Sequence, residues 1–181
     1  PPQLGRREVH QEFSTELTHF SMAWHIPEVT SPDVPALDLL STILGDGRSS
    51  QLYRRVREEA GLAFGISAFS YTPGAPGLFG IDATLDPKKR EAAENLALQI
   101  VDEVKQTGVT ADELEKAKKI MLSQHLGALT TMRGQASDVG SNWFLTRDLN
   151  FSREYLDAIQ KVTLEDIKRV AGTYLTENNL T

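Results

Sequence analysis

Cysteine is absent from the 181-residue sequence, which excludes disulfide bonds, a thiolate nucleophile and metal sites with cysteine ligands. No run approaches the roughly 18 apolar residues of a membrane-spanning helix, and no stretch has the pattern of a signal peptide. Basic residues are outnumbered, 19 Lys and Arg against 25 Asp and Glu, giving a formal net charge of −6. Nucleic-acid binding, which usually requires a basic surplus, is therefore not indicated.

The remaining composition, 40% hydrophobic and 24% charged, is ordinary for a globular protein. A length of 181 residues suffices for one domain with a substantial core. We find no internal repeat or long linker, so residues 1–181 are treated as a single domain. The chain begins at Pro1, and a new apolar segment starts within 177–181. We therefore expect both ends to be boundaries inside a longer protein.

Three segments show the alternation of a half-buried strand. In 18–26, Phe20, Met22, Trp24 and Ile26 share one face, and residues 6–12 are a possible hairpin partner. The segments 62–71 and 78–85 follow, joined by turn chemistry at 72–77. The second of them places Phe79 and Ile81 on the buried side.

Helices are predicted around these strands from their start and stop signals. Thr110 to Glu113 and Thr163 to Asp166 have the spacing of capping boxes, and Asp86-Pro87 supplies an N-cap followed by a proline. The expected helices run from about 33 to Gly45, 49–59, 87–107, 110–131, 152–161 and from 163 to about 172. This order predicts an α+β fold. We expect a mixed, mostly antiparallel sheet with helices mainly on one face, and a core of Phe20, Trp24, Ile66, Phe79, Ile81, Leu96 and Ile100.

The four histidines give no convincing metal or catalytic site. His19 and His25 lie on one strand face but about 20 Å apart at the rise of a strand, so they cannot share an ion. His10 could lie opposite His19 across a hairpin, but no third ligand is placed beside them. His125 falls on the apolar stripe of its helix, and a partly buried core histidine is the simpler explanation.

Two further patterns have both a structural and a functional interpretation. The turn at 45–50 precedes a helix but lacks the spacing and lysine of a phosphate-binding loop, so a helix-entry turn is the default. On the following helix, Arg54 and Arg57 would be neighbours at 3.6 residues per turn, with Arg55 pointing elsewhere. A solvated basic face paired with Glu58 and Glu59 is the simpler explanation, and substrate binding is the alternative.

The block Gly-Asp-Gly-Arg-Ser-Ser-Gln-Leu-Tyr-Arg-Arg-Val-Arg-Glu-Glu-Ala-Gly-Leu-Ala-Phe at 45–64 changes that balance. It resembles a signature of the insulinase/pitrilysin family of zinc metallopeptidases, which includes the mitochondrial processing peptidases. The resemblance is to the zinc-free half of those proteins, and it continues through 77–81, the helix at 87–107 and 107–118. It thus extends over nearly the whole chain.

The resemblance implies a metallopeptidase-like half-domain that faces a zinc domain across a closed chamber holding a peptide. In the family, the zinc-free domain offers an arginine that binds substrate backbone and, seven residues later, a tyrosine that helps to hold the oxyanion. Arg57 stands at the arginine position, whereas Phe64 stands at the tyrosine position. Phenylalanine has no hydrogen-bond donor, so it cannot hold an oxyanion as tyrosine does.

The family's zinc motif, His-x-x-Glu-His on a helix, has one near match, from His25 to Val29. Val29 replaces the second histidine and Pro27 prevents a helix there. We therefore expect no metal on this chain, with zinc on a partner domain of the same chain or a separate subunit. The chain alone is expected to be non-catalytic and to serve as the substrate-holding domain of a zinc metallopeptidase. The alternative is a non-proteolytic structural or peptide-binding scaffold.

Overall fold

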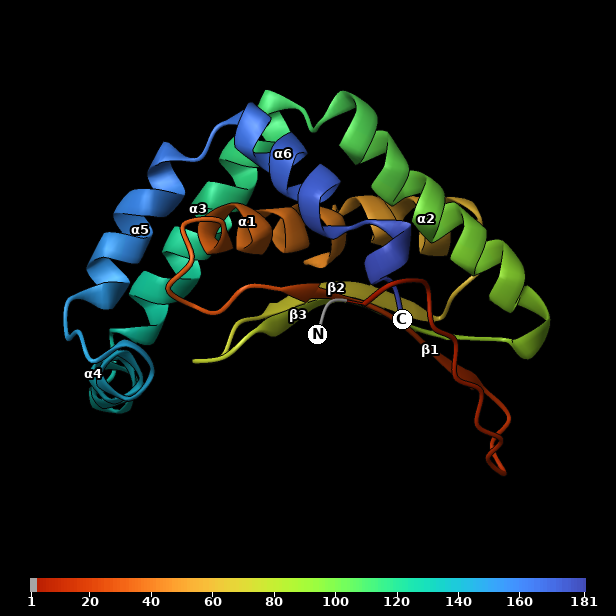
Figure 1. Ribbon diagram of the computed structural model, residues 1–181, viewed down its shortest axis with the longest axis horizontal. Helices are drawn as coiled ribbons and strands as arrows, with labels where there is room; N and C mark the ends of the chain where they lie inside the picture. Colours follow the sequence, from red (N-terminus) through yellow and green to blue (C-terminus); the bar gives the residue numbers. More distant parts are fainter. Residues whose placement is uncertain (1–2) are drawn as a thin grey trace.

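The computed structural model describes residues 3–181 and has two layers, a sheet and a group of helices over one of its faces (Figure 1). The strands are β1 (Thr18–Ile26), β2 (Gly65–Tyr71) and β3 (Gly77–Leu85), in the spatial order β1-β3-β2. Both strand pairings are antiparallel. The predicted α+β class is confirmed.

The alternation predicted for β1 and β3 is also confirmed, since their buried side chains all face the helices. Trp24 pairs with Phe79 across the two strands, and their rings meet edge to face with centroids 6.3 Å apart. Both side chains are almost completely buried, as are Ile81 and Ile100. Of the predicted core, only Phe20 and Leu96 are partly rather than fully buried. The centre of the core therefore lies between β3 and the helical layer.

The helical layer contains five further α-helices besides α1 (Val34–Gly45), which runs directly along the sheet (Figure 1). They are α2 (Arg90–Thr107), α3 (Ala111–Ala128), α4 (Met132–Thr146), α5 (Phe151–Lys161) and α6 (Leu164–Tyr174). Shorter helical segments are η1 (Tyr53–Glu59), η2 (Pro87–Lys89) and η3 (Glu177–Asn179). Because α1 packs against both the sheet and the outer helices, nearly all of its residues are buried.

The predicted helix starts are present as hydrogen bonds. The Thr110 hydroxyl accepts from the Glu113 N–H at 3.2 Å, while the Glu113 carboxylate accepts from the Thr110 N–H at 2.9 Å. Thr163 and Asp166 make the same reciprocal pair at the start of α6. The Asp86 carboxylate accepts from the Lys88 N–H at the start of η2. These caps satisfy N–H groups that have no partner within their own helices.

The prediction that residues 6–12 pair with β1 as a hairpin is wrong. The outer edge of β1 instead pairs with the last residues of the chain, where Ala23 and Thr181 exchange two backbone hydrogen bonds of 2.8 and 2.9 Å. Leu180 is buried there and bridges to Trp24. Residues 6–12 are almost entirely polar, so they have no apolar face to place against the core.

The predicted helix over 110–131 ends at Ala128, and the sequence analysis did not identify α4. The Thr131 hydroxyl accepts from the Gly134 N–H and starts this separate helix. Asn142 is the one buried residue of α4. A helix with no buried apolar stripe has no hydrophobic periodicity to detect.

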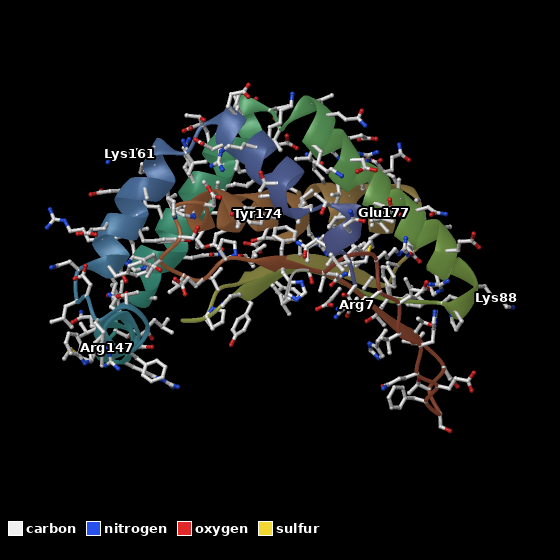
Figure 2. The ribbon with its side chains drawn as sticks, viewed as in Figure 1. Arg7, Lys88, Arg147, Lys161, Tyr174 and Glu177 are labelled. Atoms are coloured by element: carbon white, nitrogen blue, oxygen red, sulfur yellow. The ribbon has the colours of Figure 1, made fainter. Side chains whose placement is uncertain are left out.

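Within residues 3–181, nothing covers the face of the sheet opposite the helices. α4 at one end and the segment before β1 at the other extend past the sheet on this side, so the uncovered face lies between two projections (Figure 1). Figure 2 shows their side chains around this space, with Arg147 at the end of α4. Across residues 3–181, none of the helices is both long and apolar enough to cross a membrane.

Candidate functional site

The block at 45–64 connects α1 to β2 and contains both structural and exposed residues. Gly45 touches β2 so closely that a Cβ atom there would lie 1.8 Å from the Ala68 nitrogen. Leu52 and Val56 are fully buried. These positions explain why the chain needs a glycine and apolar residues at this spacing. Arg57 and Phe64 are exposed and have no such packing role.

The turn at 45–50 is held by α3. The Gln124 amide donates to Asp46 at 3.2 Å, Lys116 donates to Ser49, and Gln51 donates to Glu113 at 2.8 Å. The Ser50 hydroxyl donates back to the Gly47 carbonyl. The side chains of Asp46, Ser49 and Ser50 are thus engaged in structural contacts, in agreement with a helix-entry turn.

The winding of η1 differs from the α-helix that the spacing predicts. Tyr53–Glu59 forms a π-helix, and the Ala60 N–H bonds to the carbonyl of Arg55, five residues earlier. Arg54 consequently reaches Glu59, also five residues away, with a 3.5 Å ion pair. The prediction that Arg54 and Arg57 are neighbours on one face assumed 3.6 residues per turn, and the π-helix does not have that winding. Short π-helical stretches are rare and are often found at functional sites.

The arginines of η1 therefore have three different environments. Arg55 forms a two-pronged ion pair with Glu103 of α2, at 2.5 and 3.0 Å. These hydrogen bonds raise the pKa of Arg55 and lower the pKa of Glu103. Arg57 instead donates from Nη1 to the Tyr53 hydroxyl at 2.7 Å, and its guanidinium lies over the Tyr53 ring. Within residues 3–181, Arg57 makes no ion pair with an acidic side chain.

Arg57 and Tyr53 line an open hollow of about 530 Å³ on the uncovered face of the sheet. Its other walls come from all three strands, and its polar lining includes His19, Ser21, Ser67 and Asp82. Ser21 and Ser67 flank Asp82 in strand register, and the Ser21 hydroxyl donates to Asp82 Oδ1 at 2.6 Å. The hollow thus combines one guanidinium, one carboxylate and several hydroxyl groups.

Phe64 lies immediately before β2, where its N–H donates to the Thr84 carbonyl at 2.8 Å. Its side chain is 60% exposed, whereas that of Ile66 is 7% exposed. Phe64 is therefore not a core residue packed with Ile66. Phe64 is next to Gly65 and bonded to Thr84, which both line the hollow, but Phe64 itself does not line it.

The other end of the uncovered face is apolar. The Phe69 ring lies over Gly80, where any Cβ would approach the ring to 2.2 Å. Tyr71 and Leu78 are opposite one another in the last pair between β2 and β3 and are both exposed. The face therefore changes from charged and hydroxylated at the Asp82 end to aromatic near the turn between β2 and β3.

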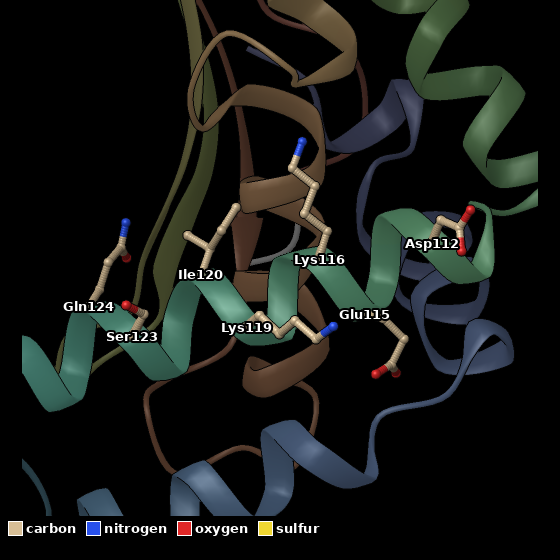
Figure 3. A pocket seen from close by; sticks show the side chains of 7 residues that line it. All are labelled: Asp112, Glu115, Lys116, Lys119, Ile120, Ser123 and Gln124. Atoms are coloured by element: carbon tan, nitrogen blue, oxygen red, sulfur yellow. The ribbon is translucent and has the colours of Figure 1, made fainter.

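A second hollow of similar size, about 540 Å³, lies against α3 (Figure 3). Its lining residues, Asp112, Glu115, Lys116, Lys119, Ile120, Ser123 and Gln124, all come from this one helix. Figure 3 shows their side chains spreading from the helix, with Lys116 directed toward the turn that it holds. Because these side chains diverge rather than point to a common centre, we assign no site there.

None of the histidines in residues 3–181 belongs to a group of ligands suited to a metal. His25 is exposed on β1 and contacts Asn179, with Nδ1 3.1 Å from Oδ1, while His10 contacts Glu8. His125 is partly exposed on α3. In residues 3–181 no three His, Cys, Asp or Glu side chains form a group able to hold a metal ion.

Residues 1–121 match the family model described as the Peptidase M16 inactive domain. The chain belongs to this family. The resemblance inferred from 45–64 to the zinc-free half of zinc metallopeptidases is therefore confirmed. The match covers the sheet, α1, η1, α2 and most of α3.

Curated relatives agree with this assignment. The chain is 30% identical over 185 residues to an uncharacterized zinc protease of Streptomyces coelicolor, covering 96% of the chain and 39% of the relative. It is also 30% identical over 179 residues to a Schizosaccharomyces pombe protein named probable mitochondrial-processing peptidase subunit alpha. That match covers 92% of the chain and 35% of the relative. A Helicobacter pylori relative named as a non-peptidase homolog is 24% identical over 180 residues, covering 98% and 41%. The chain thus spans less than half the length of these relatives.

Solved structures with this fold include a protease from Helicobacter pylori, with a TM-score of 0.92 and 23% identity, covering all of this chain and 44% of that one. An M16 inactive domain from Pseudomonas fluorescens has a TM-score of 0.81 and 24% identity, covering 93% and 40%. At these identities the structures establish the fold alone.

Sequence reasoning singled out Arg57 and Phe64 but did not identify Tyr53 or Asp82. The signal for Asp82 was available, because the alternation of β3 places it on the face opposite Phe79 and Ile81. The signal for Tyr53 was available too, because Tyr53 precedes Arg57 by four residues, the spacing of neighbours on a helix.

Proposed function

We propose that this domain forms one wall of a peptide-substrate chamber in a zinc metallopeptidase, opposite a zinc-bearing domain. The observation that carries the proposal is the hollow on the uncovered sheet face, with Arg57 beside it at the position implied by the family resemblance. A guanidinium has five N–H donors, and Arg57 uses one of them on Tyr53. The others are available for peptide carbonyl groups.

Phe64 contributes apolar surface beside the hollow in this proposal. Its exposure allows contact with a peptide or with the opposing domain. It cannot donate a hydrogen bond, so this domain stabilises a developing oxyanion less than one with tyrosine at the same position.

The partner is a zinc domain of the same family, either on the same chain or as a separate subunit. Large apolar side chains are exposed on α4, among them Met132, Trp143 and Phe144. Surfaces of this kind often mark contacts with another protein. The names of the zinc protease and processing-peptidase relatives support a proteolytic assembly. Zinc would be supplied by the partner.

The test is hydrolysis of a quenched fluorescent peptide by the zinc domain, by this chain and by both together. We expect cleavage only with both, abolished by a chelator, and no stoichiometric zinc on this chain after dialysis. Cleavage by this chain alone in the presence of chelator would contradict the proposal, as would one tightly held zinc ion per chain.

A second candidate function is a non-proteolytic peptide-binding scaffold. The absence of a hydroxyl at Phe64 and the relative named as a non-peptidase homolog favour it. In that case the two domains associate but do not cleave, and Phe64→Tyr does not create activity. A stable but inactive pair with a fully zinc-loaded partner would select this alternative.

A further inference from the structure

We propose that Asp38 and Tyr155 form a pH-dependent latch between α1 and the α4–α5 arm, which we define as residues 132–158. The latch holds the arm against α1 while Asp38 carries a proton and releases it when the carboxyl group ionises. This device is independent of the peptide-binding function proposed above.

The α4–α5 arm lies at one end of the molecule, where α4 projects past the sheet (Figure 1). Asn142 is the buried residue of α4, and Ile159, just beyond the arm, is that of α5. The two helices are bonded to each other, since the Ser152 hydroxyl lies 2.6 Å from Asp138 Oδ1 and 2.7 Å from Asn142 Oδ1. They can therefore move together as one unit.

Tyr155 makes the polar connection between the arm and the elements that support it. Its hydroxyl donates to Oδ2 of Asp38 on α1, and its ring stacks on that of Phe151 with centroids 6.1 Å apart. Across residues 3–181, no other side chain of the arm forms a hydrogen bond or ion pair with a strand or with α1, α2, α3 or α6. The attachment of the arm thus depends on the state of Asp38.

The Asp38 carboxyl group has hydroxyl neighbours but no basic partner. From β2, the Ser70 hydroxyl is buried beside it, without a hydrogen bond of ordinary geometry in residues 3–181. Within the same residues, no Lys, Arg or His lies within 4.0 Å of this carboxyl. Titratable side chains of the neighbouring elements have partners of their own or are at least partly exposed, namely Asp33, Tyr71, His125, Arg153, Glu154 and Asp157.

Ionisation of Asp38 favours separation of the arm from α1. A neutral carboxyl group accepts from Tyr155 and can donate its own proton to the Ser70 oxygen. Both hydroxyl groups favour the ionised form, but burial opposes it more strongly and raises the pKa of Asp38. Because α1 is packed between the sheet and the outer helices, movement of α5 is the readiest way for water to reach the carboxylate. A closed state that binds the proton more tightly than the open state is favoured at low pH and lost as the pH rises.

Release of the arm changes the surface beside the uncovered face of the sheet. α4 is one of the two projections that flank this face, and it carries the exposed Met132, Trp143 and Phe144. The latch therefore makes the position of this apolar surface depend on pH.

Hydrogen–deuterium exchange of the full chain from pH 5 to pH 9, followed by mass spectrometry and corrected for the intrinsic exchange rate, tests the latch. We expect protection of the arm to fall about tenfold or more between pH 5 and pH 8, since each unit of difference between the closed and open pKa changes the opening constant tenfold. Peptides from α2 should show no such fall. Protection of the arm that is independent of pH overturns the latch, and so does an equal loss over the whole chain.

Asp38→Asn should keep the arm protected at every pH, because the amide accepts from Tyr155 and can donate to Ser70. Tyr155→Phe removes the connection and should lower protection of the arm already at pH 5. Asp157→Asn, which makes the same charge change on an exposed position of α5, and His125→Gln on α3 are controls that should retain the pH dependence. Persistence of that dependence in Asp38→Asn, or its loss in His125→Gln, assigns it to another group and overturns the proposal.

A distance measurement shows whether the arm moves as a unit. The chain contains no cysteine, so donor and acceptor dyes can be attached through Ser141→Cys on α4 and Lys88→Cys, which lies at the opposite end of the molecule (Figure 2). Energy transfer should differ between pH 5 and pH 8, and this difference should vanish when Asp38→Asn is added. A loss of protection with unchanged energy transfer would mean that α4 and α5 fray in place, which contradicts release of the arm.

Discussion

The guanidinium of Arg57 lies over the ring of Tyr53, with Cζ 4.6 Å from the ring centroid, and donates to its hydroxyl at 2.7 Å. The two residues are four apart in the π-helix η1 and both line the hollow. A cation stacked on an aromatic ring and hydrogen-bonded to it loses less freedom when it binds a ligand. Tyr53 is therefore a positioning residue for Arg57 in the proposed function.

Arg57→Ala should weaken binding of an acetylated, amidated peptide about tenfold or more, because charge-assisted hydrogen bonds to its carbonyl groups are lost. In the proposed peptidase assembly the same variant should raise KM and lower kcat/KM. Tyr53→Phe should have a smaller effect, about two- to threefold, since the ring remains. Binding titrations and steady-state kinetics measure these changes.

Arg54→Ala is the control for Arg57. Arg54 lies on the same π-helix but pairs with Glu59 on an exposed surface, so its loss should change binding by less than about twofold. Equal losses in the two variants would show that general charge, rather than the Arg57 site, attracts the peptide.

Phe64→Tyr should leave the melting temperature unchanged. The side chain is 60% exposed, so the added hydroxyl remains in water and does not incur the penalty of about 1–3 kcal/mol for a buried unsatisfied group. In the assembled enzyme, kcat should rise, by less than the roughly hundredfold that a preorganised oxyanion donor supplies. An unchanged kcat in an active enzyme would exclude the oxyanion role at position 64.

Gly45→Ala should destabilise the domain by about 3 kcal/mol, because the new Cβ would overlap the backbone of Ala68 and separate α1 from β2. Thermal or denaturant unfolding provides the measurement. Gly172→Ala in α6 is the matched control. No atom lies within 4 Å of its added Cβ, and alanine favours a helix, so stability should rise by about 0.5–1 kcal/mol.

Asp33 should account for part of the loss of stability in acid. Burial raises its pKa, but hydrogen bonds from Arg169 at 2.8 Å and Tyr174 at 2.6 Å outweigh that and lower it below the ordinary 3.8. A lowered folded pKa contributes stability above the unfolded value, which is lost as the pH falls through the folded one. Asp33→Asn should cost about 1–2 kcal/mol at pH 7 and little at pH 2. An equal cost at both values would contradict the linkage.

Asp38 should show the opposite dependence. Burial raises the pKa of Asp38, because it disfavours the charged carboxylate. The hydrogen bond from Tyr155 lowers the pKa by less than burial raises it. Stability from this position is therefore greatest below the unfolded pKa and is lost as the pH rises through the folded one. Asp38→Asn keeps an acceptor for Tyr155 and should be neutral or stabilising by about 1 kcal/mol at pH 8. Unfolding curves at pH 4 and pH 8 provide the comparison.

The sequence by itself determined the α+β class, the three strands and most helix starts. These features depend on local causes, namely alternation along Thr18–Ile26 and Gly77–Leu85 and the capping side chains of Thr110 and Thr163. The sequence also determined the family, because the packing of 45–64 requires glycines and apolar residues at fixed positions. Arg57 could be selected by that resemblance.

Only the tertiary structure decided which side chains meet on the uncovered face. The edge of β1 is covered by Leu180 and Thr181 rather than 6–12, since only Leu180 can be buried beside Trp24. The pairing of Asp82 with Ser21 depends on the register between β1 and β3. Local sequence patterns do not encode this contact, because it joins two strands that are far apart in the sequence.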